Sequence, residues 1–199
     1  PFVLALVVAL ARGLPRGATP WLAGLAPPLG LVLLAWVTPG VLQGWHLRAD
    51  HAWLPQIGLA FTLRLDGQAW MFAGLVLAIG VLVVMYAHYY LAEEDSAPRF
   101  FGCLLFFMGS MLGVVIAGNL LLLLVFWELT SISSFLLIGF WYKRQAAREG
   151  ARMALAITGG GGLALLGGVL LIGRITGSYD LDVVLASGDA IRASELYPW

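Results

Sequence analysis

Charged side chains are scarce in this chain. Asp, Glu, Lys and Arg make up 11% of the 199 residues, against about 25% in an average soluble protein. Hydrophobic residues make up 61%. So few charges cannot cover the surface of a water-soluble domain of this size. The composition therefore indicates an integral membrane protein.

An excess of basic residues and a set of cysteines are also missing. Eleven basic and eleven acidic residues give a formal net charge of zero, which leaves no electrostatic footprint for a nucleic acid. The single cysteine, Cys103, excludes an internal disulfide and a multi-cysteine metal site. The glycine run 159–162 lacks the Gly-Lys-Ser/Thr ending of a phosphate loop. We therefore expect no nucleic-acid partner, no metal and no cofactor.

Long apolar runs are what the chain has in abundance. The 43 residues between Arg99 and Lys143 contain one charged residue, Glu128. A membrane-spanning helix takes about 20 residues, so this run predicts two spans with a turn at 117–119. The same argument predicts an all-α membrane protein, a polytopic bundle of six helices in a single domain over 1–199. Its spans lie at about 1–11 (partial), 21–41, 69–91, 100–117, 119–141 and 153–173, before an outer loop at 174–199.

The amino end does not fit a signal peptide. The chain starts at Pro1, and the apolar run 2–11 is too short to span and has no basic segment before it. We expect it to be the end of a truncated first helix, and the chain to be a fragment of a longer one. The orientation in the membrane is predicted from the charges of the loops. The loops 12–20, 92–99 and 142–152 carry seven of the eleven basic residues, and basic loops tend to face the cytoplasm, so we expect these three loops on the cytoplasmic side.

Two segments outside the spans have patterns of their own. Residues 57–65 alternate apolar with small or polar residues, which predicts a strand, and Asp66 is placed to cap the next helix. The strand either pairs with a hairpin or neighbouring subunit, or forms an ordered cap over the helix ends. Residues 180–195 predict a short helix on the outer surface with a break at Gly188.

Glu128 is the strongest candidate for chemistry. It is the only acid inside a predicted span, and it lies nine residues after Asn119, about 14 Å into a hydrocarbon core of about 30 Å. A charge at that depth costs at least about 2.5–3.5 kcal/mol. Desolvation favours the neutral acid, and a nearby cation favours the carboxylate. Glu128 can therefore take up and release a proton; the alternative is a protonated side chain that joins two helices by one hydrogen bond.

Weaker candidates surround this acid or lie apart from it. Ser131, Thr130 and Ser134 extend a polar side of the same helix, either as a water-lined path or as hydroxyls bonded to backbone carbonyls. His88, next to three tyrosines, is either a proton relay or a headgroup anchor. The repeat of Gly160, Ala164 and Gly168 predicts close approach of another helix.

The segment 126–140, FWELTSISSFLLIGF, resembles the fifth helix of the large A-type subunit of the Mrp-type monovalent cation/proton antiporters. The resemblance extends over about residues 16–199. It includes the segments 64–67, 86–91, 119–121 and 187–193. His88 stands where that family has Arg.

This resemblance implies a secondary transporter of the bacterial inner membrane rather than an enzyme. The Glu matching Glu128 would pair with a Lys on the seventh helix, beyond Trp199, and the two would pass protons in exchange for Na⁺ or K⁺. Other membrane subunits of the complex and the lipid bilayer would be its partners. The main alternative is the related proton-pumping subunit of NADH-quinone oxidoreductase (complex I) or a membrane hydrogenase, although the hydroxyl-rich stretch 130–134 favours the antiporter. A purely structural membrane subunit is a third possibility.

Overall fold

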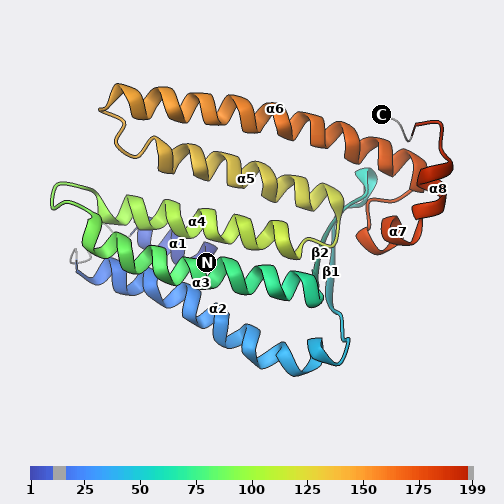
Figure 1. Ribbon diagram of the computed structural model, residues 1–199, viewed down its shortest axis with the longest axis horizontal. Helices are drawn as coiled ribbons and strands as arrows, with labels where there is room; N and C mark the ends of the chain where they lie inside the picture. Colours follow the sequence, from blue (N-terminus) through green and yellow to red (C-terminus); the bar gives the residue numbers. More distant parts are fainter. Residues whose placement is uncertain (11–16, 197–199) are drawn as a thin grey trace.

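Helices make up most of the computed structural model, which describes residues 1–10 and 17–196. The short α1 (Phe2–Leu10) precedes five long helices. These are α2 (Ala18–Leu42), α3 (Gly67–Tyr90), α4 (Ala97–Ile116), α5 (Leu120–Ile138) and α6 (Gln145–Thr176). They lie side by side in chain order, with α1 against α4 (Figure 1). All five are long and apolar enough to cross a membrane, which confirms the predicted helical membrane fold.

The helix ends agree with the apolar runs in most places. The turn expected at 117–119 separates α4 from α5. The last long helix starts earlier than predicted, at Gln145, because its first turns carry charged residues that a hydropathy pattern excludes but a helix accepts. Part of the first predicted span and loop, including Arg12 and Arg16, and the last three residues lie outside the described residues.

One end of the bundle carries a two-stranded antiparallel hairpin. Strand β1 (Leu47–Leu54) pairs with β2 (Leu59–Leu65), and a single 3₁₀ turn, η1 (Pro55–Ile57), joins them through Gly58 at φ +75°. The predicted strand is confirmed from Leu59 onward, while β1 was missed because all eight of its residues are exposed and give no apolar face. The hairpin also packs on α3, α4 and α5, so it covers the helix ends as well.

Asp66 and Asp180 cap the helices that follow them. Asp66 Oδ1 accepts a hydrogen bond from Ala69 N at 2.8 Å, as predicted from the sequence. Beyond α6, the predicted outer helix is two short ones, α7 (Leu181–Ala186) and α8 (Gly188–Ala193), with Ser187 between them. Both lie beside the hairpin at the same end of the bundle (Figure 1).

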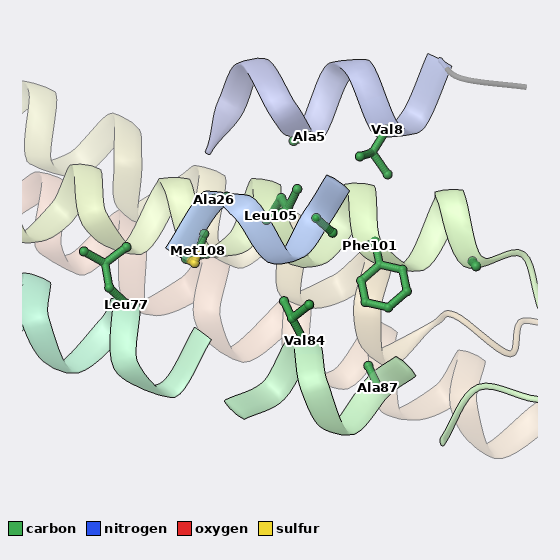
Figure 2. Packing of buried hydrophobic residues seen from close by; sticks show 11 residues of the cluster. Ala5, Val8, Ala26, Leu77, Val84, Ala87, Phe101, Leu105 and Met108 are labelled. Carbon is green, nitrogen blue, oxygen red and sulfur yellow. The ribbon is translucent and has the colours of Figure 1, made fainter. Parts of the chain in front are cut away.

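The hydrophobic core lies among the first four helices (Figure 2). Small side chains such as Ala5 and Ala26 let the helices approach, and Phe101 and Leu105 fill the centre with no exposed surface. The outside of the bundle is apolar too: the side chains of Trp21 and Trp36 are 76% and 79% exposed. Such a surface is stable against lipid and not against water.

Candidate functional site

The start of α5 is fixed by one buried residue. Asn119 Oδ1 accepts hydrogen bonds from Leu121 N at 3.0 Å and Leu122 N at 3.2 Å, and Asn119 Nδ2 donates to Gly58 O at 3.0 Å. The side chain therefore caps α5 and ties it to the hairpin turn. This fixes how deep each later residue of α5 lies in the bundle.

The end of α6 is joined to the start of α5. Leu120 N donates to Tyr179 O at 2.8 Å, and Leu181 N donates to Gly118 O at 2.9 Å. The Tyr179 ring occupies space that side chains at Gly58 and Gly173 would need. Backbone bonds and one aromatic ring thus hold α5, α6 and the hairpin together at this end.

Ion pairs add a second connection there. Arg48 pairs with Asp50 at 2.8 Å, with Asp182 at 2.5 Å and with Asp180, and Arg64 pairs with Asp182 at 2.9 Å. Arg48 lowers the pKa of Asp180 and of Asp50 from their ordinary values. In return the pKa of Arg48 is raised, and the hydrogen bond to Asp180 is the largest cause. The pairs with Asp180 and Asp182 join the hairpin to the start of α7, although each is partly exposed and individually weak.

Two opposite faces of α5 contact α4 and α6. Phe126 is buried against Gly113 of α4, where a methyl group would lie 2.5 Å from the ring atom Cε1. Glu128 is two residues further, about 200° around the helix, and its carboxyl meets α6 at Gly162. A methyl at Gly162 would overlap Glu128 Oε1 and lie 3.0 Å from Cδ. The acid therefore lies at the α5–α6 interface.

The contact between Glu128 and Gly162 lies near the middle of both α5 and α6. Glu128 is the ninth residue of the 19-residue α5, and Gly162 is also near the centre of α6. The Glu128 side chain is half-buried. Within the part of the chain that the structure describes, it makes no hydrogen bond or ion pair. Glu128 is therefore a mid-helix acid without a polar partner among residues 1–10 and 17–196.

Two of the three predicted hydroxyls, those of Thr130 and Ser131, bond to the backbone of their own helix. Thr130 Oγ1 and Ser131 Oγ both donate to Trp127 O, at 2.6 and 3.3 Å. Ser133, which the sequence pattern did not indicate, is fully buried and donates to Leu129 O at 2.7 Å. Ser134 makes no hydrogen bond within the described residues. Backbone bonding, the alternative considered for these residues, is what the structure has for Thr130 and Ser131.

His88 is not brought near this acid. It lies exposed in the last turn of α3, with its ring centroid 4.9 Å from that of Tyr89 and 6.5 Å from that of Trp21. Helix α4 separates α3 from α5 (Figure 1). An exposed ring among aromatic side chains at a helix end is typical of a membrane-interface anchor. No group of three or more potential metal ligands exists among the described residues.

The contact of Gly162 with Glu128 was not predicted from the sequence. The predicted packing repeat of Gly160, Ala164 and Gly168 does not meet another helix in the described chain, because Gly160 and Gly168 have open space around them. The helix approach occurs at Gly162 instead. The glycine run 159–162 indicates the helical turn of α6 that contacts Glu128, but it does not reveal which of its four glycines faces the acid.

Two family models match the chain. The family of NADH:quinone oxidoreductase and Mrp antiporter transmembrane segments matches residues 117–195, which contain both Glu128 and Gly162. The family of complex I chain 5 N-termini matches residues 53–101. In Rhizobium meliloti, a probable K⁺/H⁺ antiporter A/B subunit is 56% identical over 99% of this chain and 20% of its own length. The chain belongs to the family of A-type Mrp antiporter subunits.

Other members of the Mrp family agree with this assignment. The A1 subunit of the Na⁺/H⁺ antiporter of Staphylococcus aureus is 37% identical over 99% of this chain and 25% of its own length. A chain of the Mrp complex from Dietzia sp. DQ12-45-1b superposes with a TM-score of 0.86 and 29% identity, over 98% of this chain and 21% of that one. The chain thus spans about a fifth to a quarter of the length of its curated relatives.

The fold extends beyond antiporters. The archaeal membrane-bound sulfane sulfur reductase, a respiratory complex, contains a chain with a TM-score of 0.78 at 20% identity, over 94% of this chain and 38% of that one. At that identity the likeness concerns the fold alone. The relatives that share more sequence are named as antiporter subunits, which are secondary transporters and not enzymes. The chain is a multi-pass protein of the bacterial cell membrane.

Proposed function

We propose that the full-length protein is one subunit of a multisubunit antiporter that exchanges protons for Na⁺ or K⁺, and that Glu128 is its proton-binding group in this region. One observation carries the proposal: the carboxyl of Glu128 lies at mid-depth between α5 and α6 without a hydrogen-bond or ion-pair partner among the described residues. A structural acid that joined two helices would bond to one of them. Glu128 instead contacts a glycine, which has no donor side chain to offer.

The proposed mechanism is electrostatic. Without a nearby cation, a desolvated carboxyl keeps its proton; an approaching ammonium group within about 4–6 Å stabilises the carboxylate and releases the proton. Among the described residues, Lys and Arg lie outside the helices or within about two turns of a helix end, Arg152 deepest as the eighth residue of α6, and none of them pairs with Glu128. We propose that the cation is a Lys in the remaining part of the full-length protein, as the family resemblance implies.

The polar side of α5 is proposed as part of the path. Thr130 and Ser131 donate their protons to the backbone, but each hydroxyl oxygen can still accept a hydrogen bond from water. With Ser134, they would hold waters along α5 next to the acid. The other membrane subunits of the antiporter complex would close this path against lipid.

The test is proton exchange by the assembled complex in everted membrane vesicles, followed with a pH-sensitive dye after addition of Na⁺ or K⁺. We expect Glu128→Ala to abolish exchange because it removes the proton site, and Glu128→Asp to retain part of it. Glu149→Gln, which alters an exposed acid in the first turns of α6, is the matched control and should exchange normally. Assembly is checked by co-purification of the partner subunits. Normal exchange by Glu128→Ala in an assembled complex would refute the proposal.

A further inference from the structure

Helix α6 has six glycines within ten residues, and only one of them is enclosed by the described chain. Positions 159, 160, 161, 167 and 168 have nothing within 4 Å of where a side-chain carbon would stand. Gly162 is buried, and the atoms around it belong to Glu128. Because glycine weakens a helix relative to alanine, its presence at an enclosed mid-helix position calls for a steric reason.

The steric reason is the Glu128 carboxyl. A carbon at Gly162 would overlap Oε1, lie 3.0 Å from Cδ and lie 3.6 Å from Oε2. The three atoms nearest to that carbon all belong to this one group. The carboxyl group therefore occupies the volume that any other residue at 162 would fill.

The two helices cannot simply move apart to admit a side chain. Gly162 shares one face of α6 with Ala151 and Gly173, each eleven residues away, which is about three turns. Ala151 lies against Gly139, the residue that follows α5, and Gly173 lies against the ring of Tyr179, whose backbone is bonded to the start of α5. Contacts on both sides of Gly162 thus fix the spacing of α5 and α6. A methyl at 162 would displace the carboxyl and not the helix.

We infer that Gly162 is a positioning residue for the Glu128 carboxyl: its missing side chain forms the notch that holds this group on the α6 side of α5. This inference rests on the proposed function of Glu128 for its effect on transport. Its geometric part, the position of the carboxyl, can be measured without transport.

The transport experiment compares Gly162→Ala with Gly161→Ala in the full-length protein and assembled complex. Both changes raise helix propensity equally, but only the first meets the carboxyl. We expect Gly162→Ala to lower the exchange rate by about ten- to a hundredfold, since a displacement near 1 Å of a reacting group can cost about 10²-fold. Gly161→Ala should stay within about twofold of the parent.

The Glu128→Asp background separates positioning from general damage. Asp is one methylene shorter, so its carboxyl is drawn back from α6 and leaves room for the methyl group. We expect the fold-loss caused by Gly162→Ala to be at least severalfold smaller in the Asp background than in the Glu background. An equal fold-loss in both backgrounds overturns the inference, because a structural defect in α6 would not depend on the length of the acid.

The second measurement is the rate at which a hydrophobic carbodiimide, dicyclohexylcarbodiimide, modifies Glu128, quantified by mass spectrometry of the 120–138 region. Displacing the carboxyl from its notch exposes it, so Gly162→Ala should be modified faster than the parent and Gly161→Ala at the parental rate. Unchanged modification of Gly162→Ala overturns the inference and leaves the proposed function standing. Normal exchange by Glu128→Ala together with faster modification of Gly162→Ala refutes the proposed function and leaves the notch.

Discussion

Replacing Asn119 by alanine tests how the N-terminal end of α5 is held. The side chain is 3% exposed and makes three hydrogen bonds, two as the cap of α5 and one to the hairpin turn. Asn119→Ala removes all three and leaves the amide of the buried Leu122 without its acceptor. The residues that follow, including Glu128, depend on this cap for their depth along α5.

The expected loss can be worked out from these bonds. Losing an Asn cap costs about 1 kcal/mol. The bond to Gly58 O adds about 0.5–1.5 kcal/mol, and no more, because Gly58 is exposed and water can replace the donor. A total of about 1.5–2.5 kcal/mol corresponds to a roughly ten- to sixtyfold increase in local opening, since about 1.4 kcal/mol is tenfold.

Hydrogen–deuterium exchange of the amides at 120–123, read by mass spectrometry on the assembled complex, measures that opening. Asn119→Asp separates the two contributions because it keeps the acceptor for both amides and loses only the donor to Gly58. We expect it to exchange faster than the parent and slower than Asn119→Ala. Unchanged exchange in Asn119→Ala would show that the cap does not stabilise the start of α5, and equal exchange in both variants would show that the hairpin bond is the larger contribution.

Two further predictions concern the two ends of the bundle. The Arg48 guanidinium lowers the native pKa of Asp180 below 3.8, so the ion pair contributes fully to stability above that pH and is lost as the pH falls through the native pKa. After correction for intrinsic rates, hydrogen–deuterium exchange of the amides at 178–183 should be constant near neutral pH and rise below about pH 4. Asp180→Asn, which keeps the cap of α7, should differ from the parent by about 0.2–1 kcal/mol in local opening free energy at neutral pH and converge with it in acid. In a Cys103→Ser background, an impermeant maleimide should label Arg148→Cys only from the cytoplasm and the fully exposed Asp189→Cys only from outside; the reverse pattern would invert the topology.

Local sequence patterns were sufficient for the helices and for several helix ends. An apolar run of about 20 residues predicts a span because the bilayer leaves its backbone no partners other than its own. The turn at 117–119 was predictable because the apolar run around it is long enough for two spans. The Asp66 cap was predictable because a capping side chain acts on amides two or three residues away. Glu128 was evident as a candidate because a single acid stands out in an uncharged segment.

Pairings between distant segments were not predictable. Strand β1 has no buried face, so nothing in its own residues indicates the hairpin. The ion pairs of Arg48 with Asp180 and Asp182 join residues more than 130 positions apart. The charges were visible in the sequence, but only the hairpin and the loop after α6 bring them together.

The sequence by itself determined which segments cross the membrane and that one of them carries an acid at mid-depth. Tertiary structure decided which way that acid points. A soluble helix reveals its buried face by alternating apolar and polar residues, whereas α5 is apolar on nearly every side because both lipid and protein interior accept apolar groups. Its rotation is therefore set by shape, with Phe126 against Gly113 on one side and Glu128 against Gly162 on the other. Steric fit between helices, which no local pattern encodes, places the carboxyl at α6.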